Sequence, residues 1–243
     1  ALFFYEVENE NDFYDEYVQR QIKTGANERL ISLYKRLLNG GLNADSRVLE
    51  LGCGVGIFTK LLAKKVKNGI IEAVDLSEKS VAVAKNELKD RNNIHFDVAD
   101  VVKYQPKNSD FDMITLMDVI EHIPLEHHAE LFANLAEIAT EKTNILINIP
   151  NPQYIGYVRI NHPESLQVID QEVELFTLMQ HLEKNGLELA YFEKYGIWEQ
   201  DDYHFMVIRK KRNFELKHLS DQRNFSKKIF HKLTTKIDAV KYK

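Results

Sequence analysis

A chain of 243 residues, 44% of them hydrophobic, is long enough for one α/β domain with short additions at its ends. No stretch approaches the roughly 18 consecutive apolar residues of a membrane-spanning helix, and the acidic start lacks the basic region of a secretion signal. The single cysteine, Cys53, excludes an internal disulfide and a cysteine-based zinc site. We therefore expect a cytoplasmic protein.

The net charge of −5 is unevenly distributed along the chain. Residues 212–243 carry a charge of +6, whereas residues 1–211 carry −11. An acidic body differs from the broad basic surface with which nucleic-acid-binding proteins hold a phosphate backbone. We therefore expect no nucleic-acid partner for residues 1–211.

Residues 1–42 are predicted to form an N-terminal helical cap. Apolar residues recur at helical spacing over 10–38, with an interruption near 24–27. Gly40 and Gly41 follow the last apolar residue of the pattern and predict the end of the helix.

The most informative stretch runs from Val48 to Phe58. An apolar strand over 48–51 leads into Gly52–Gly56, in which glycine alternates with other residues, and then into a helix. Glycine allows a sharp turn and leaves room for a ligand against the main chain. The N-terminus of the following helix offers unsatisfied N–H groups to that ligand. The stretch therefore predicts a site for a nucleotide-like ligand.

A second apolar run, Ile70–Val74, ends at Asp75. A carboxylate at the tip of the second strand of such a unit can accept hydrogen bonds from both hydroxyls of a ribose. Ser77 is expected to cap a helix over 77–89. The alternative for Asp75 is that it caps this helix itself.

Strands and helices alternate through the rest of the body. The predicted elements are strands over 94–98, 111–117, 146–150, 187–194 and 203–210, and helices from Pro124 to about 139 and over 171–184. His127 and His128 are expected to face solvent. Residues 151–163 are predicted to be a long loop after the fifth strand, where α/β folds form substrate pockets.

Acidic residues also follow the third and fourth strands, in Asp100-Val101 and in the run Met117–Pro124. This order of glycines, acidic residues and strands resembles the class I S-adenosylmethionine-dependent methyltransferases, especially the branch that modifies small molecules. The resemblance is close over residues 45–150 and extends to 211 by layout only. It implies a doubly wound, Rossmann-like α/β fold with a seven-stranded sheet whose last strand is antiparallel. The methyltransferase domain would then span residues 43–211.

The rival interpretation is a dinucleotide-binding oxidoreductase, whose fingerprint is G-x-G-x-x-G. Here the spacing is G-x-G-x-G, and Ile57 follows the last glycine. Glu50, two residues before the first glycine, fits the methyltransferase pattern, because that cofactor carries a cationic amino-acid end. The methyltransferase interpretation is therefore preferred.

The resemblance implies S-adenosylmethionine as cofactor and S-adenosylhomocysteine as product. The residues that it assigns to this cofactor are Glu50, Gly52, Cys53, Gly54, Gly56, Asp75, Leu76, Asp100, Val101, Met117 and Asp118. Glu50 would complement the ammonium group, and Leu76, Asp100 and Val101 would hold the adenine. For Glu50, Asp100 and Asp118 the alternative is a structural role: contact with neighbouring backbone, a helix cap and a turn, respectively.

Two histidines are candidates for a general base, because imidazole can remove a proton from a hydroxyl near neutral pH. His122 follows the fourth strand, and His162 lies in the segment after the fifth strand. Each has a structural or surface role as its alternative. An amine acceptor that arrives neutral would need no strong base.

An alternative is that the chain binds a divalent metal, as do methyltransferases that act on the 3′-terminal ribose of RNA. The side chains that could donate to such a metal are those of Glu121, His122 and His162. The acidic body argues against an RNA substrate, and no metal site is expected. A binding protein that kept the fold without catalysis is the remaining alternative.

We expect a small metabolite or an activated sugar or polysaccharide precursor as substrate, methylated on oxygen or nitrogen. The candidate pocket residues are Tyr14, Tyr17, Arg20, Arg29, Tyr154, Tyr157 and Arg159. The arginines would suit an anionic substrate group.

Residues 212–243 are predicted to form a basic amphipathic helix, most regular over 220–240. Its apolar face is expected to pack on the body or on a second copy of the chain, which suggests a homodimer. A membrane surface or an acidic partner is the alternative.

Overall fold

The computed structural model describes residues 25–166 and 170–213. The chain divides into two compact units, Ala1–Lys211 and Arg212–Lys243. The predicted homodimer contact through the C-terminal helix and the candidate pocket residues Tyr14, Tyr17 and Arg20 lie outside the described residues.

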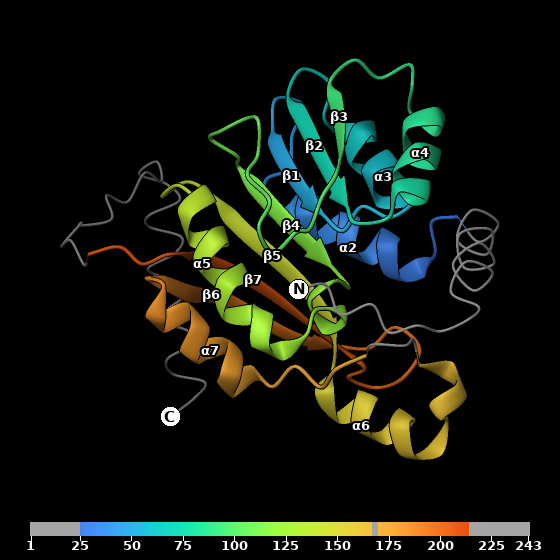
Figure 1. Ribbon diagram of the computed structural model, residues 1–243, viewed down its shortest axis with the longest axis vertical. Helices are drawn as coiled ribbons and strands as arrows, with labels where there is room; N and C mark the ends of the chain where they lie inside the picture. Colours follow the sequence, from blue (N-terminus) through green and yellow to red (C-terminus); the bar gives the residue numbers. More distant parts are fainter. Residues whose placement is uncertain (1–24, 167–169, 214–243) are drawn as a thin grey trace, which may run out of the picture. The chain divides into compact units, whose positions relative to one another are not determined.

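The first unit contains a seven-stranded sheet with the strand order β3-β2-β1-β4-β5-β7-β6 (Figure 1). Its strands are β1 (Arg47–Leu51), β2 (Ile70–Asp75), β3 (Ile94–Val98), β4 (Met113–Met117), β5 (Asn144–Pro150), β6 (Leu187–Tyr195) and β7 (Tyr203–Lys210). The first five strands pair in parallel, and β7 is antiparallel to both of its neighbours. The predicted doubly wound sheet with an antiparallel last strand is confirmed.

Six α-helices accompany the sheet in the described residues. They are α2 (Glu28–Asn39), α3 (Ile57–Lys65), α4 (Glu78–Glu87), α5 (His128–Ile138), α6 (Pro152–Asn161) and α7 (Leu175–Lys184). Short 3-10 turns cover Ile120–His122, Leu125–His127 and Pro163–Ser165. None of the helices in these residues combines the length and apolar character that crossing a bilayer requires.

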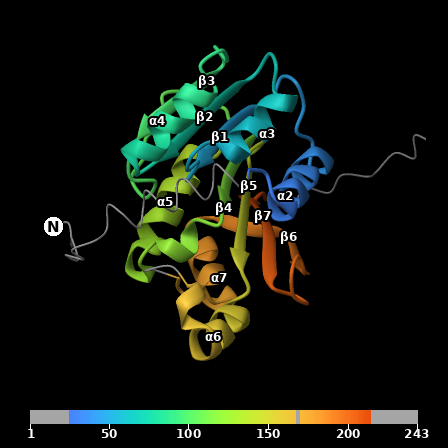
Figure 2. The same cartoon turned by 90° about the vertical axis from the view of Figure 1, so that its right-hand side faces the viewer.

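Alternating side chains of the strands form two hydrophobic cores. Leu49 and Leu51 of β1 join the core that includes α5 and α7, whereas Val48 joins the core that includes α2 and α3. Figure 2 accordingly shows α5 and α7 on one side of β4 and β5, and α2 on the other. Helices on both faces leave the carboxyl edge of the parallel strands as the place for a ligand.

The prediction of a loop over residues 151–163 was wrong, because most of this segment is helix α6. Asn151 caps the helix by accepting a hydrogen bond from the Gln153 backbone N–H (3.1 Å), and Pro152 occupies its first turn. Only Pro152, Ile155 and Val158 of this helix are buried. Such a short apolar stripe among aromatic and polar residues gives little helical periodicity in the sequence.

His128 was also predicted incorrectly, since it is buried whereas His127 is exposed. The His128 Nε2 atom lies 2.9 Å from the Ile120 carbonyl oxygen and 3.0 Å from that of Ile123. Burial lowers the pKa of His128, which favours the neutral imidazole. The His128 ring therefore hydrogen-bonds to the backbone carbonyl groups of the turn that follows β4.

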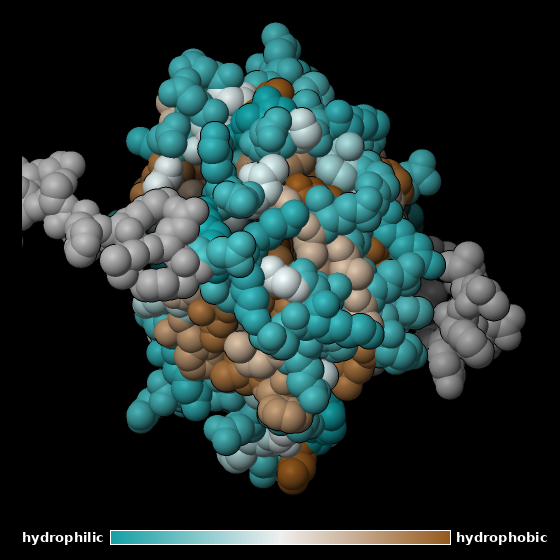
Figure 3. Space-filling view, turned by 90° about the vertical axis from the view of Figure 1, so that its left-hand side faces the viewer, coloured by the Kyte–Doolittle hydropathy of each residue, from teal (hydrophilic) through white to brown (hydrophobic). Residues whose placement is uncertain are grey.

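Helices α6 and α7 expose apolar side chains. Ile160 is 82% exposed and Phe176 is 74% exposed. Figure 3 shows apolar surface among polar side chains in the lower half of the face that it views. Contiguous exposed apolar side chains are typical of surfaces that contact another molecule, but no extensive contact between the described residues of α6 and α7 joins them into one patch.

Candidate functional site

The turn between β1 and α3 presents backbone rather than side chains to the carboxyl edge of the sheet. Gly52 and Gly56 have φ angles of 81° and 80°. A Cβ atom at Gly52 would lie 2.3 Å from Val119 Cγ2, and one at Gly56 would lie 2.8 Å from the Ala84 Cβ. Both positions therefore require glycine for close packing as well as for the turn. No side chain among the described residues caps the N-terminus of α3, so its N–H groups remain available to a ligand.

Asp75 fixes this turn to the end of β2. Its Oδ2 atom accepts a hydrogen bond from the Gly54 N–H (2.7 Å), and its Oδ1 atom accepts one from the Ser77 N–H (2.9 Å). The cap of α4 is Ser77, whose Oγ accepts from the Ser80 N–H. Asp75 is thus placed between the glycine turn and the start of α4, where a ribose would meet it.

Glu50 is a buried carboxylate with an unsatisfied oxygen. The residue is 3% exposed, and its Oε2 atom has no hydrogen-bond partner among the described residues. Burial, with a further contribution from the charge of Asp75, raises the pKa of Glu50 to about 8. An unpaired buried carboxylate is costly. A cationic ligand group beside Glu50 would remove this cost, which fits the ammonium end of the cofactor implied by the sequence.

The predicted adenine residues differ in their surroundings. Leu76 follows Asp75 and is 72% exposed, as expected for a side chain that would cover an adenine ring. Asp100 Oδ1 accepts a hydrogen bond from the Val102 N–H (2.9 Å), and Val101 packs in the core. Asp100 thus stabilises a turn after β3; the helix cap that was its alternative is not formed, and its adenine assignment stays a prediction.

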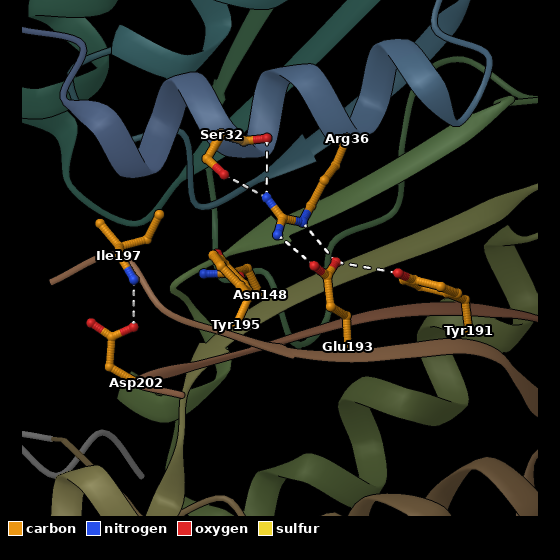
Figure 4. Close-up of polar contacts among 8 residues, drawn as sticks. All are labelled: Ser32, Arg36, Asn148, Tyr191, Glu193, Tyr195, Ile197 and Asp202. Carbon is orange, nitrogen blue, oxygen red and sulfur yellow. Dashed lines mark hydrogen bonds and ion pairs between the residues drawn. The ribbon is translucent and has the colours of Figure 1, made fainter. Parts of the chain in front are cut away.

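Asp118, at the end of β4, belongs to a chain of polar contacts that joins β4, β5 and β6. It adopts a positive φ of 58°, and its Oδ1 atom accepts a hydrogen bond from Asn148 Nδ2 (2.6 Å). Asn148 Oδ1 in turn accepts one from the Tyr195 hydroxyl (2.7 Å), and both residues appear in Figure 4. Asp118 Oδ2 lies 3.1 Å from Arg29 Nη1. The carboxylate is thus held in place by its neighbours, while Met117 lies half-buried beside it.

Arg29, a predicted pocket residue, lies at the centre of an aromatic cluster. Its Nη1 atom donates to the Tyr203 hydroxyl (3.1 Å), and its guanidinium carbon lies 5.6 Å and 5.8 Å from the ring centres of Tyr203 and Trp198. Burial opposes the positive charge, but Asp118 and Tyr203 outweigh it and raise the pKa of Arg29 above its ordinary value. Arg29 therefore stays charged beside the end of β4.

The loop between β6 and β7 is shaped by the buried carboxylate of Asp202. This carboxylate accepts hydrogen bonds from the backbone N–H groups of Ile197 (2.9 Å), Trp198 (3.1 Å) and Glu199 (3.2 Å). Figure 4 shows the bond from Ile197. Trp198 is 55% exposed although its backbone is fixed in this way. The structure therefore holds an exposed aromatic ring at a defined place next to Arg29.

The two candidate bases lie in different environments. The His122 Nδ1 atom is 3.2 Å from Asp170 Oδ1, and the side chain is 29% exposed. His162 ends helix α6, is largely exposed and lies 3.7 Å from a carboxylate oxygen of Glu164. Only His122 follows β4 directly, at the carboxyl edge of the sheet.

The donors of the metal alternative do not come together. The residues that the structure describes contain no group of three or more His, Cys, Asp or Glu side chains placed to hold a metal. Glu121 is buried, and burial together with the charge of Asp118 raises its pKa well above its ordinary value. Asp170 contacts His122 and its charge also acts on Glu121, whereas the carboxylate beside His162 is that of Glu164.

The candidate pocket residues of the segment after β5 lie on α6. Arg159 forms an ion pair with Glu172 (2.9 Å) and also donates to the Asp170 carbonyl. Arg159 therefore helps to fix the segment that contains Asp170, the residue beside His122. Tyr157 is 58% exposed, and burial raises the pKa of Tyr154, with Asp202 acting in the same direction.

A separate hollow of about 540 Å³ lies at the amino end of β3, the opposite edge of the sheet from the glycine turn. Its lining includes Lys85, Lys89, Arg91 and His95. None of the residues predicted for cofactor or substrate lines this hollow, so it is not part of the site.

Sequence reasoning missed five residues that build the site. They are Asn148, Tyr195, Trp198, Asp202 and Tyr203. One signal was available: Asn148 interrupts the apolar run Ile145–Ile149, and a polar residue inside a buried strand needs a specific partner. The partners themselves lie about fifty residues further along the chain, and no local pattern identifies them.

Comparisons with known proteins identify the family of the chain. A family model described as a methyltransferase domain matches residues 14–226. Malonyl-[acyl-carrier protein] O-methyltransferase 1 of Ilyobacter polytropus is 28% identical over 200 residues, which cover 79% of this chain and 72% of that protein. A ubiquinone biosynthesis O-methyltransferase of Coxiella burnetii is 37% identical over 78 residues, 32% of each chain.

The fold is shared with solved methyltransferase structures. Magnesium protoporphyrin IX methyltransferase from Synechocystis PCC 6803, solved with bound S-adenosylhomocysteine, superposes with a TM-score of 0.64 at 17% identity. The superposition covers 84% of this chain and 96% of that one. At this level of identity the likeness concerns the fold.

Proposed function

Because this chain belongs to the methyltransferase-domain family and is an S-adenosylmethionine-dependent methyltransferase, we propose that it transfers the methyl group to an oxygen of a small-molecule acceptor. The observation that carries this proposal is the unpartnered carboxylate of Glu50 beneath a glycine turn. The names of the two relatives, both O-methyltransferases, support oxygen as the accepting atom.

We assign the cofactor to the carboxyl ends of β1 and β2. Glu50 would pair with the ammonium group, and the backbone of Gly52–Gly56 would line the methionine part. Asp75, already fixed by the Gly54 N–H, would accept from the ribose hydroxyls, and exposed Leu76 would cover the adenine. When bound, the cofactor supplies an electrophilic methyl group on a sulfonium.

The protein's part in the reaction is alignment and proton removal. The acceptor oxygen must lie about 3 Å from the methyl carbon, in line with the departing sulfur. We assign His122 as the general base for a hydroxyl acceptor, because Asp170 beside its Nδ1 atom would stabilise the imidazolium that forms. A carboxylate acceptor is already deprotonated near neutral pH and would need no base.

Calorimetric titration of the full chain with S-adenosylhomocysteine tests the cofactor site. Asp75→Ala should weaken binding at least tenfold, because it removes the ribose acceptor and releases the Gly54 N–H. Asp90→Ala, which changes an exposed carboxylate just beyond α4, is the matched control and should leave affinity within twofold of the parent. Full affinity in Asp75→Ala would contradict the assignment.

Mass spectrometry of pooled small metabolites after incubation with cofactor tests the reaction. The expected result is a gain of one methyl group on an oxygen-bearing compound, lost in His122→Ala when the acceptor is a hydroxyl. Activity abolished by EDTA and restored by Mg²⁺ would favour the metal-assisted alternative instead.

A further inference from the structure

Strand β3 forms one edge of the seven-stranded sheet and lies beside helix α4 (Figure 1). The Asn93 carbonyl, just before β3, accepts a hydrogen bond from the Ile71 N–H of β2. Backbone groups of successive residues in a strand point to opposite sides, so Phe96 and Val98 turn their N–H and C=O groups away from β2. No other strand in the described residues pairs with that side of β3. The strand therefore has an open edge.

Proteins usually protect such an edge with a proline, a bulge or charged side chains. Strand β3 contains no proline, and its pairing with β2 runs without a bulge to Val98, which is 46% exposed. The one acidic side chain of β3, Asp97, is paired with Lys107 (2.6 Å). Charged side chains are thus the only protection of the edge, and their sign decides which strands it repels.

The hollow of about 540 Å³ described above follows this edge. Ile94, His95 and Phe96 all line it, although side chains of successive strand residues point to opposite faces of the sheet. Its apolar base includes Leu88 and Ile94, which are buried, and half-buried Phe96. None of the described residues that line it is acidic, whereas four are cationic: Lys85, Lys89, Arg91 and Lys107.

Three of these four cations are uncommitted. Lys107 pairs with Asp97. In the described part of the chain, the side chains of Lys85, Lys89 and Arg91 make no ion pair and no hydrogen bond. Residues 1–211 carry a charge of −11, so these cations form a local exception on an acidic body. The edge of β3 therefore attracts anionic groups and repels basic ones.

The wall of the hollow opposite α4 is fixed by a buried carboxylate. Glu72, which is fully buried on β2, accepts hydrogen bonds from the Tyr104 hydroxyl (2.7 Å) and from the backbone N–H groups of Lys107 (2.8 Å) and Asn108 (3.1 Å). The segment that carries Lys107 is thereby held against the sheet. A hollow built in this way needs little ordering when a ligand enters.

We propose that β3 binds an extended acidic segment of another protein as an added strand. Its main chain would pair with the free backbone groups of Phe96 and Val98, and its carboxylates would meet Lys85, Lys89 and Arg91. The hollow lies at the amino end of β3, away from the glycine turn, so this inference is independent of the proposed function.

Fluorescence anisotropy with the full chain tests the proposal. The probe is a fluorescein-labelled peptide in which glutamate alternates with valine. One comparison peptide carries lysine in place of glutamate, and the other is the acidic peptide N-methylated along its backbone. The acidic peptide should bind at least tenfold more tightly than either, because the first comparison reverses the charge and the second removes the N–H groups that pair strands.

The matched variants are Lys89→Glu and Lys142→Glu. Lys89→Glu reverses one charge of the hollow and should weaken binding of the acidic peptide at least fivefold. Lys142 is exposed just before β5, four places from β3 in the strand order, and Lys142→Glu should leave the affinity within twofold. S-adenosylhomocysteine affinity should stay within twofold in both variants.

Equal binding of the acidic peptide and its N-methylated form would overturn the proposal, and this comparison needs no variant should Lys89→Glu fail to fold. Absence of binding by all three peptides would overturn it too, because the cations would then serve only to block the edge. Sedimentation of the full chain without peptide completes the test. Self-association that Lys89→Glu abolishes would assign the edge to a second copy and contradict the proposal.

Discussion

The β1–β2 half of the candidate site, which we assign to the cofactor, and its β4–β7 half, here called the acceptor half, are built in different ways. In the cofactor half, adjacent strands and a glycine turn bring backbone N–H groups and Asp75 together, and leave Glu50 unpaired. In the acceptor half, side chains from α2, β4 and β7 (Arg29, Asp118 and Tyr203) contact one another. The first half is thus a backbone cradle with one buried, unpaired carboxyl group, whereas the second is a network of paired side chains.

This difference predicts how residues of the two halves affect the stability of the unliganded protein. Glu50 weakens the unliganded protein when it is ionised, because burial penalises its negative charge. Asp118 strengthens it, because it pairs with Arg29 and Asn148. Substitutions at Glu50 and at Asp118 should therefore change stability in opposite directions.

The largest expected effect is the pH dependence that Glu50 gives to the unliganded chain. Its pKa is about 8 in the folded state and near 4.5 when unfolded, so the folded state holds a proton that the unfolded state has lost. Stability should therefore fall by about 4 kcal/mol between pH 4.5 and pH 8 through this group alone. In Glu50→Gln that part of the decline should be absent, as measured by denaturant unfolding at several pH values. Equal slopes in the two proteins would contradict the burial of an unpaired carboxylate.

The next effect concerns the glycine turn. Gly52→Ala should destabilise the chain by about 3 kcal/mol, since its Cβ would collide with Val119 and alanine disfavours a φ of 81°. It should also abolish measurable binding of S-adenosylhomocysteine. Gly41→Ala is the control, because Gly41 also has a positive φ but nothing lies within 4 Å of the added Cβ. A similar loss of cofactor binding in both variants would show that the loss in Gly52→Ala does not come from the close packing against Val119.

The smallest effect lies in the acceptor half. Asp118→Ala should lower the free energy of unfolding by about 2 kcal/mol, because Arg29 and the Asn148 amide lose their partner while Arg29 remains partly hydrated. Glu87→Ala, which breaks the exposed Lys60–Glu87 pair, should change it by less than about 0.5 kcal/mol. Indistinguishable melting curves for these two variants would show that the network is not a stabilising one.

The same comparison explains what the sequence could reveal. The fold, the family, the enzyme class and the cofactor were predicted correctly, because the glycine turn, Asp75 and the strand pattern are local features of the chain. The roles of the individual site residues stay predictions, as do the cytoplasmic location, the domain boundaries and the homodimer.

The acceptor half could not be predicted in the same way. The contacts of Asn148, Tyr195 and Tyr203 form only when strands β5, β6 and β7 pair. The spacing of residues in the sequence does not predict which strands pair. Arg29 was named as a pocket residue, but its partner Asp118 was assigned to the cofactor, because their contact joins segments far apart in the chain. Helix α6 and buried His128 were predicted incorrectly for a related reason: tertiary contacts, not local periodicity, determine them.

The most direct test of the cofactor site is the number of protons released when S-adenosylhomocysteine binds. With a pKa of about 8, Glu50 is mostly protonated at pH 7 in the free protein and should ionise when the ammonium group arrives. Calorimetry at pH 7 in buffers of different ionisation enthalpy should therefore give close to one proton released per S-adenosylhomocysteine bound, and close to none in Glu50→Gln. Binding without proton release, or a release that persists in Glu50→Gln, would contradict the assignment of Glu50 to the ammonium group.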